Sequence, residues 1–569
     1  MFKVTRDVII AAAVATLMVS STAAWYFNII TEPKNIEVVT ITETPFVVLQ
    51  SSFVYLGKMA VELTLELQNS AAVTQSTEIE IQALDASGEI ILDDGGAPLI
   101  QYSEALNIAP GGTYLETFLF EKKSIRDELS VFLIILSGDP NVMSVFTSGG
   151  GTSIPPNALI GYSGGGLGGP AVPKYRFYDL AWSDEHMVPD TVDSNIRLVR
   201  TVFNPASGET DTAAMVVLSE QETLYIYTYD GFSWSFAQIG KPWTSRPNSV
   251  ARPFDVEYEK TSGRAVLVYE NNGVDASKDL TYRIYDGSTM VHEGYIDDPA
   301  GKKDYYWVSL TQNPDPGSNE LALLGVTSDG YVGCWIWDGS TWADFYRLST
   351  SVTDVAHEVG SLAYERSTGE LLVAAAKQKI ISTATYDGAW HVGSSVSFGS
   401  NNIYWVVLKP DPVSDDVMLM GIDSGTDLYT NLWGGAGWAS SQLMDNRLYT
   451  TTTRCFDGDW MPTGSTFLLV VGDYGVDALS YKTWSSGVWT PSGLNAWEIY
   501  VGGTDNQWWI QVRGNLKDEY PYMLVGSLDR SKVICATSWD GSSLTEQTVM
   551  TTQGLTTYES FEAAFSYPP

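Results

Sequence analysis

Cysteine and histidine are scarce in this sequence, with three cysteines and four histidines in 569 residues. Cys334, Cys455 and Cys535 lie far apart and form no C-x-x-C pair, so the sequence indicates neither a disulfide framework nor a zinc site. Cys334 and Cys535 each come shortly before an aromatic-Asp-Gly motif. We interpret these two as strand residues at equivalent positions of a repeat.

Basic residues are also few, and charged residues of either sign make up only 18 % of the chain. The 68 acidic residues outnumber the 32 basic ones, which gives a formal net charge of −36. Such a surface repels phosphate backbones, so we predict no nucleic-acid partner. Solubility or a salty habitat explains the acidity. Binding of divalent cations is a more specific alternative. We predict no cofactor and no metal ligand.

The first 30 residues combine a basic start with an apolar run. Lys3 and Arg6 precede apolar residues 8–19, and small residues follow at 20–24. This is the layout of a secretory signal peptide. Because the apolar character continues to residue 30, residues 8–30 are also long enough to cross a bilayer if they are not cleaved. We predict a signal peptide or a membrane anchor helix, and an extracellular or cell-surface location. A pilin-like filament helix is a third interpretation.

Residues 36–140 have the pattern of a small β-rich module. The stretch KMAVELTLELQNS alternates polar and apolar residues, and turn signals separate about seven such runs. We predict an immunoglobulin-like β-sandwich here. Residues 141–173 are rich in Gly, Ser and Pro and are predicted to be a linker, or a loop that lies on the next domain.

Residues 174–569 contain a repeat. An aromatic-Asp-Gly motif, followed by a Trp, returns more or less intact eight times. Its first aromatic falls at Tyr178, Tyr229, Tyr285, Trp337, Tyr386, Trp433, Trp484 and Trp539. A period near 50 residues is typical of a repeat fold. Each unit reads as four antiparallel strands, which is one blade of a β-propeller. We predict an all-β chain with eight blades, or seven if the first partial unit is only a lead-in.

The motif itself has a structural explanation. Asp-Gly favours a tight hairpin because both residues tolerate positive φ, and the Asp carboxylate can accept hydrogen bonds from the turn amides. The flanking aromatics can pack between adjacent blades. The C-terminal YESFEAAFSYPP resembles a first strand, and KYRFYDLAW resembles the later half of a blade. We therefore predict that one blade mixes strands from both ends and closes the ring.

The repeats of residues 174–569 resemble those of secreted bacterial and archaeal β-propellers. More distantly they resemble propeller lectins, which also carry Trp- and Gly-marked blade turns. The resemblance implies an exported, surface-attached binding or adhesion protein whose partner is a glycan or a surface protein. The first alternative is a structural subunit of a filament or surface layer, which would self-assemble through the N-terminal segment and the β-sandwich.

The predicted ligand-binding residues are the tryptophans that follow the motif, because an indole face stacks well on a sugar ring. They are Trp234, Trp342, Trp390, Trp438 and Trp489. Packing between blades is the competing interpretation of each.

A secreted glycoside-active enzyme is the second alternative function. It would need two carboxylates about 5–10 Å apart, or a metal. The histidines His186, His292, His357 and His391 are isolated, and no nucleophile elbow or phosphate-binding loop is present. We predict that the protein is not an enzyme.

Overall fold

The structure is a computed structural model, and its contacts divide the chain into two units, Met1–Ile154 and Pro155–Pro569. In the first unit it describes residues 38–41, 46–55, 60–69, 75–77, 79–84, 90–93, 97–103, 106–110, 113–121, 131–136 and 143–147. In the second it describes residues 157–164, 171–179, 181–188, 191–206, 212–231, 233–240, 251–271, 280–301, 304–352, 354–464, 466–500, 505–517, 521–545, 547–555 and 558–567. Throughout these residues the regular structure is β-strand, and none of them belongs to a helix that could span a membrane. The predicted N-terminal signal or anchor helix lies outside them.

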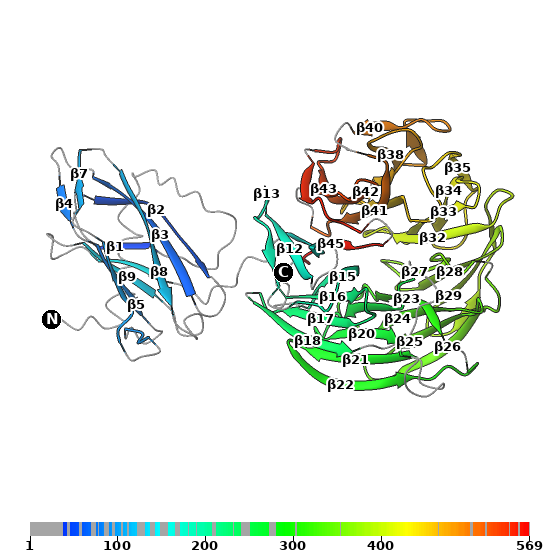
Figure 1. The fold of residues 1–569 in the computed structure, drawn as a ribbon, viewed down its shortest axis with the longest axis horizontal. Helices are drawn as coiled ribbons and strands as arrows, with labels where there is room; N and C mark the ends of the chain where they lie inside the picture. The colour runs from blue at the N-terminus through cyan, green and yellow to red at the C-terminus, as the bar shows by residue number, and fades with distance from the viewer. Residues whose placement is uncertain are drawn as a thin grey trace. The chain divides into compact units, whose positions relative to one another are not determined.

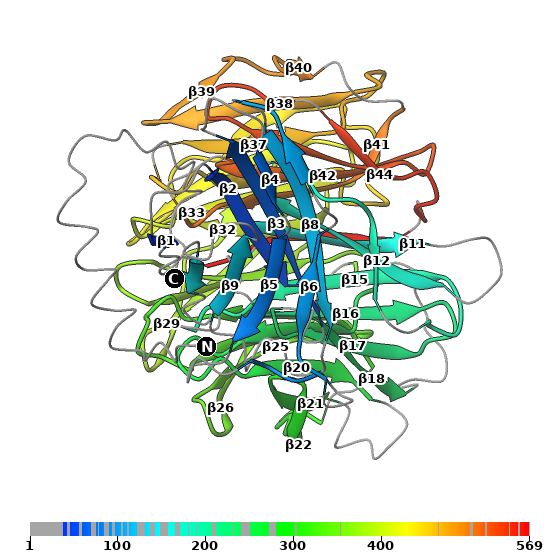
Figure 2. The same ribbon diagram turned by 90° about the vertical axis from the view of Figure 1, so that its left-hand side faces the viewer.

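The first unit is built from antiparallel sheets (Figure 2). A five-stranded sheet has the order β1 (Val38–Ile41), β10 (Met143–Thr147), β9 (Val131–Leu136), β5 (Ile79–Leu84) and β6 (Ile100–Tyr102). A second sheet has the order β2 (Phe46–Tyr55), β3 (Ala60–Asn69) and β8 (Thr113–Glu121), and β4 (Gln75–Thr77) pairs with β7 (Leu106–Ile108). Alternate residues of β5, namely Ile79, Ile81 and Ala83, are buried, as are Phe118 and Phe120 of β8. The predicted strands are confirmed, while the immunoglobulin-like assignment stays a prediction.

The second unit is a β-propeller of eight blades, each an antiparallel sheet (Figure 1). In each blade the first strand named lies innermost, and the others follow outward. Blade 1 contains β45 (Phe561–Phe565), β11 (Ala158–Gly164), β12 (Val172–Asp179), and β13 (Ala181–Trp182) with β14 (His186–Met187). Blade 2 contains β15 (Ile196–Phe203), β16 (Ala213–Ser219), β17 (Leu224–Tyr229) and β18 (Trp234–Gly240). Blade 3 contains β19 (Phe254–Tyr258), β20 (Ala265–Glu270), β21 (Leu280–Asp286) and β22 (Thr289–Ile296), and blade 4 contains β23 (Tyr305–Gln312), β24 (Leu321–Thr327), β25 (Val332–Trp337) and β26 (Trp342–Ser349).

The other four blades follow in chain order. Blade 5 contains β27 (Gly360–Tyr364), β28 (Leu371–Lys377), β29 (Ile380–Tyr386), and β30 (Trp390–Val392) with β31 (Val396–Ser397). Blade 6 contains β32 (Ile403–Pro410), β33 (Asp416–Asp423), β34 (Leu428–Gly434) and β35 (Gln442–Asp445). Blade 7 contains β36 (Phe456–Trp460), β37 (Phe467–Val471), β38 (Leu479–Ser485), and β39 (Val488–Thr490) with β40 (Glu498–Tyr500). Blade 8 contains β41 (Gln507–Gly514), β42 (Met523–Asp529), β43 (Ile534–Trp539) and β44 (Thr548–Thr551).

Strands from both ends of the propeller close the ring, as the sequence predicts. The C-terminal β45 is the inner strand of blade 1 and pairs with β11, so the red strand lies beside the cyan ones in Figure 1. The propeller begins earlier than predicted, because β11 lies inside residues 141–173, which we expected to be linker. The six residues 158–163 are all buried, and the Gly- and Ser-rich flanks obscure this strand in the sequence.

The eight predicted motif aromatics all lie at or next to the C-terminal end of the third strand of a blade. The turn that follows takes a positive φ at Gly, for example 92° at Gly339, while Asp338 keeps a negative φ. Asp338 Oδ1 accepts hydrogen bonds from the amides of Ser340 at 2.8 Å and Thr341 at 2.7 Å. The predicted role of the Asp carboxylate is confirmed at this turn, and of the two residues only the Gly takes the positive φ.

The blades alternate between two kinds, which the sequence analysis did not detect. Blades 1, 3, 5 and 7 have inner strands of five residues, and blades 2, 4, 6 and 8 have inner strands of eight residues with an irregular register near their start. Each short inner strand is bonded to the long one that follows. The bonds run from the amides of Thr201, Leu310, Leu408 and Val512 to the side chains of Glu562, Asp255, Ser361 and Asp457, at 2.7–3.0 Å. The repeating unit is therefore a pair of blades.

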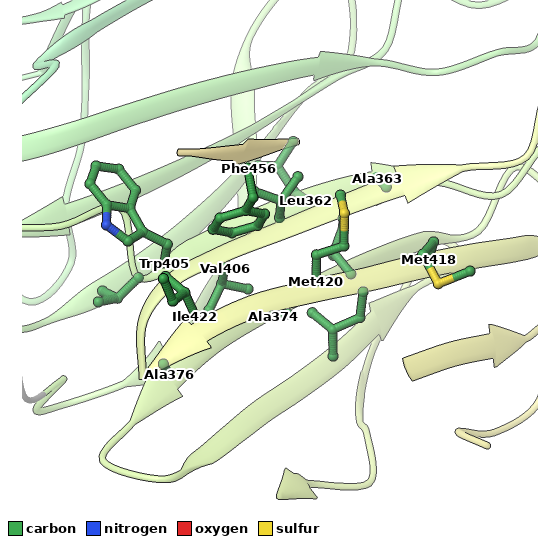
Figure 3. Packing of buried hydrophobic residues seen from close by; sticks show 14 of the residues in the cluster. Leu362, Ala363, Ala374, Ala376, Trp405, Val406, Met418, Met420, Ile422 and Phe456 are labelled. Carbon is green, nitrogen blue, oxygen red and sulfur yellow. The ribbon is translucent and has the colours of Figure 1, made fainter. Parts of the chain in front are cut away.

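Apolar side chains fill the space between blades. Figure 3 shows Trp405 of β32 and Met420 of β33 close to Ala374 of β28 and Phe456 of β36. The cysteines are part of this packing, since all three are buried and free. Cys334 pairs across the sheet with Leu324 and lies three residues before the motif aromatic Trp337. Cys535 pairs with Ser527 and lies four residues before Trp539. The two cysteines are therefore not at equivalent repeat positions, and in the alternating geometry of a strand they face opposite sides of their blades.

Candidate functional site: the axial cavity

The inner strands of all eight blades line one cavity of about 1010 Å³ on the propeller axis. Its wall contains Arg200 of β15, Asp255 of β19, Gln312 of β23, Arg513 of β41 and Glu562 of β45, among others. Its rim is rich in proline. The rim prolines are Pro205, Pro314, Pro316, Pro410, Pro412 and Pro462. The volume is at the upper end of what small-molecule sites occupy.

Ion pairs run from blade to blade around this cavity. One chain of contacts links Arg200 to Asp255 at 2.9 Å and to Glu562 at 2.6 Å. Arg513 continues it, contacting Glu562 at 2.6 Å and Asp457 at 3.3 Å. These groups are held in place by neighbours on different blades, so the cavity wall is rigid and its inner charges are already neutralised by partners.

A second set of charges alternates in sign around the axis. The residues two positions before the four short inner strands are Arg252, Glu358, Arg454 and Glu559. Arg252 contacts Glu358 at 2.5 Å, Arg454 contacts Glu358 at 3.9 Å, and Arg454 contacts Glu559 at 2.6 Å. All four are at least nine-tenths buried. Because positive and negative residues alternate, each of the four buried charges has an oppositely charged neighbour near the axis.

The network shifts the acidity of its members. Burial raises the pKa of Glu559, but the charges of Arg454, Arg200 and Arg252 outweigh it and hold that pKa at about 2. In the same way burial raises the pKa of Asp255, while Arg200 and Arg252 bring it below the ordinary value for a carboxyl group. These carboxylates are ionised at any pH near neutrality.

Charge is unevenly distributed around the rim of the cavity. The residues two positions after the short inner strands are Lys260, Arg366, Pro462 and Tyr567, and all four line the cavity. Lys260 Nζ donates to the carbonyl oxygen of Pro314 at 2.8 Å, and Arg366 Nη1 donates to the same oxygen at 3.0 Å. One half of the rim is therefore cationic, and the other half carries Pro and Tyr.

Glu257, Gln312 and Tyr567 form a hydrogen-bonded group on the cavity wall. Gln312 Nε2 donates to Glu257 Oε1 at 3.0 Å and to the Tyr567 hydroxyl oxygen at 2.9 Å. Burial raises the pKa of Glu257 to about 7, although the hydrogen bond from the amide of Tyr258 lowers it in part. Gln312 Oε1 is buried and has no partner. Polar atoms that can bind a ligand's hydroxyl groups are thus present in this wall.

The five predicted tryptophans lie on the outer parts of five different blades, and none of them lines the axial cavity. Trp234 and Trp489 are buried, and Trp342, Trp390 and Trp438 are half-buried. Each lies close to another aromatic ring, for example Trp390 stacked on Tyr346 with ring centroids 4.9 Å apart. The structure does not bring the five together, and their ligand-binding role stays a prediction.

The residues of the cavity were not among those predicted from the sequence. A signal was present in the repeats VEYEK and LAYER, where Lys260 and Arg366 both follow a buried Glu directly after a short inner strand. Aligning the repeats two blades at a time would have revealed it. Among the described residues no three His, Cys, Asp or Glu side chains are grouped so as to hold a metal ion. The prediction about cofactors remains untested.

No protein-family model and no curated protein matches this chain. Solved structures do match. BP39L lectin from Burkholderia pseudomallei has 11 % identity and a TM-score of 0.46, covering 63 % of this chain and 100 % of the lectin. The β-propeller domain of the Trilobed protease from Pyrococcus furiosus has 11 % identity and a TM-score of 0.35, covering 63 % and 98 %. The fucose-specific lectin from Aleuria aurantia has 14 % identity and a TM-score of 0.32, covering 53 % and 94 %. The chain is thus distantly similar in structure to lectin β-propellers.

Proposed function

We propose that this protein is an exported, surface-attached binding protein, and that its propeller holds a carbohydrate in the axial cavity. The single observation that carries the proposal is the cavity itself. It has a volume of about 1010 Å³ and a lining that mixes hydrogen-bonding side chains with apolar ones, including the rim prolines. A sugar presents both hydroxyl groups and apolar C–H faces, so it needs both kinds of surface.

The polar part of the wall is suited to hydroxyl groups. Gln312 Oε1 offers an unused acceptor, and Glu257 and Tyr567 are held beside it by hydrogen bonds from Gln312. Groups that are already positioned lose little entropy when a ligand binds. The apolar part comes from the rim prolines together with Val413 and Leu516, which are exposed.

Export is the other half of the proposal, and it rests on residues 1–30. A cleaved signal or a retained anchor would both place the propeller outside the membrane. N-terminal sequencing and intact mass of the protein recovered from its native cells test this part. A start near residue 24 indicates a released protein, whereas an intact apolar segment indicates an anchor or filament subunit. A protein recovered from the cytoplasm with its N-terminus unprocessed would contradict export.

Binding is tested with the full-length protein on an array of oligosaccharides, followed by calorimetric titration of the strongest binder. Thr311 lies on β23, is half-buried and lines the cavity. The variant Thr311→Trp places a bulky ring in the cavity next to Gln312 and should reduce affinity at least about tenfold, because the ring overlaps a ligand that contacts this part of the wall.

The matched controls are Trp342→Ala and Trp390→Ala on the outer strands of blades 4 and 5. We expect both to bind like the wild type. If the two tryptophan variants lose binding and Thr311→Trp retains it, the ligand site lies between the outer strands and not on the axis. Absence of binding to every member of the array would contradict the proposed function.

Hydrolysis of a glycoside is the second candidate, and one observation favours it. The pKa of Glu257, at about 7, is suited to a general acid, and Glu257 lines the axial cavity. The variant Glu257→Gln keeps the shape of the side chain and removes the transferable proton. If bound oligosaccharides are cleaved by the wild type and not by this variant, the protein is an enzyme. If the wild type releases no product, it is a binding protein.

A further inference from the structure

Two cations at the cavity rim donate to one carbonyl oxygen and form no ion pair with a described carboxylate. Lys260 follows β19 of blade 3, and Arg366 follows β27 of blade 5. Their nitrogens lie 2.8 Å and 3.0 Å from one oxygen, the carbonyl of Pro314 in the intervening blade 4. Among the described residues no carboxylate forms an ion pair with either of them, although each of the five other cations that line the cavity has one.

The closeness of these two like charges is unfavourable without an anion. Burial lowers the pKa of Lys260 to about 8, the charge of Arg366 also lowers it, and the charges of Asp315 and Glu257 act in the opposite direction. Lys260 is half-buried and Arg366 is exposed, so a solute can reach both. The chain as a whole carries 68 acidic and 32 basic residues, which makes an unpaired pair of cations at a cavity mouth unusual for this surface.

The repeat shows that this pair is not required by the fold. Pro462 and Tyr567 occupy the equivalent rim positions after β36 and β45 and carry no charge. The blade geometry is therefore compatible with neutral residues at this position. Two neighbouring copies of the repeat nevertheless carry Lys and Arg, and both point to the same carbonyl oxygen.

We propose that Lys260 and Arg366 form an anion subsite that binds the carboxylate of an acidic sugar, such as a uronic acid, at the rim of the axial cavity. This inference rests on the proposed function, because it names the class of carbohydrate that the cavity takes. A carboxylate accepts charge-assisted hydrogen bonds from a guanidinium and an ammonium group at once. The remaining sugar hydroxyls then face the group around Gln312.

The test is an array in which every uronic-acid oligosaccharide is printed beside its carboxyl-reduced, neutral twin. We expect full-length wild-type protein to favour an acidic member over its twin by at least about tenfold, as one good charge-assisted contact provides. The variants Lys260→Met and Arg366→Met should each lose this preference while they keep their affinity for the neutral twin. Lys377→Met, at an exposed lysine outside the cavity, is the control for the change in net charge.

The outcomes separate the two proposals. Equal binding of the acidic and neutral twins by the wild type overturns the anion subsite and leaves carbohydrate binding intact. A preference for the acid that survives in both Met variants also overturns the subsite, because the anion is then bound elsewhere. No binding to any member overturns the proposed function, and the subsite with it. Circular dichroism and thermal unfolding of each variant confirm that it is folded, and Lys260→Arg should keep the preference.

Discussion

The indole nitrogen of Trp337 on blade 4 donates a hydrogen bond of 2.6 Å to Oε1 of Glu259, which is fully buried at the end of the inner strand of blade 3. Trp433 and Glu365 repeat this relationship between blades 6 and 5 at 2.5 Å. The motif aromatic therefore binds to the neighbouring blade through a polar contact as well as by packing. Blade 8 lacks the contact, because Met461 takes the place of the Glu and the Nε1 of Trp539 is buried without a partner.

This difference between blades predicts two unequal effects of the same substitution. Trp337→Phe removes a hydrogen bond to a buried carboxylate and should lower the free energy of unfolding by about 1.5–3 kcal/mol more than Trp539→Phe does. Both variants lose a similar volume, so Trp539→Phe is the matched control. Urea unfolding of the full chain, followed by circular dichroism, measures the difference. Equal losses would show that the indole contact contributes nothing.

Removal of any one buried charge from the cavity wall should destabilise the folded protein strongly. Arg252→Met leaves Glu358 and Asp255 without one of their cations, so we expect a loss of about 3–5 kcal/mol in the free energy of unfolding. The exposed Lys377→Met should stay within about 0.5 kcal/mol of the wild type. The pair Arg252→Met and Glu358→Gln, made singly and together, gives their coupling energy. A coupling near zero would contradict the ion-pair network.

Stability should depend on pH in opposite directions through two glutamates. The pKa of Glu559 in the folded protein is about 2, below the ordinary value, so its contribution is present above about pH 4.5 and is lost as the pH falls toward 2. The pKa of Glu257 is raised to about 7, so the folded state binds its proton more tightly than the unfolded chain does. Its effect is to reduce stability as the pH rises from about 4.5 to 7.

The variant Glu257→Gln isolates the second effect. The wild type should lose stability relative to this variant between about pH 4.5 and 7.5, by an amount on the order of 2 kcal/mol. Unfolding midpoints measured in parallel across this range provide the comparison. A constant difference between the two proteins would mean that Glu257 titrates normally.

The three thiols should be unreactive in the folded protein. All are buried, and burial raises the pKa of Cys455 and of Cys535 to about 12. Because the thiolate is the reactive form, a thiol reagent added at pH 7.5 should label none of them until denaturant is present, and then label all three. Rapid labelling of the native protein would show that a blade opens readily.

The repeat motif determined much of the fold by itself. An aromatic, Asp-Gly and Trp at a period near 50 residues specified the third strand and its hairpin locally, since Gly takes the positive φ and Asp binds the turn amides. Local geometry of this kind is read directly from short stretches. The number of motif copies predicted eight blades, with seven as the alternative, and the structure has eight. The closing strand at the C-terminus was predicted separately, because YESFEAAFSYPP resembles a first strand.

Only the tertiary structure decided where the site lies. Lys260 and Arg366 are 106 positions apart in the numbering and meet at Pro314 because two short inner strands flank a long one. The period of two blades depends on hydrogen bonds between inner strands of different blades, so it shows in the sequence only when repeats two blades apart are compared. The five tryptophans recur in the sequence, and in the structure each of them packs against another aromatic ring outside the cavity. Equivalent positions of different blades carry different residues in the cavity. The physical reason is that the buried charges near the axis form ion pairs with residues of neighbouring blades, so the charge at one position depends on the charge on the next blade.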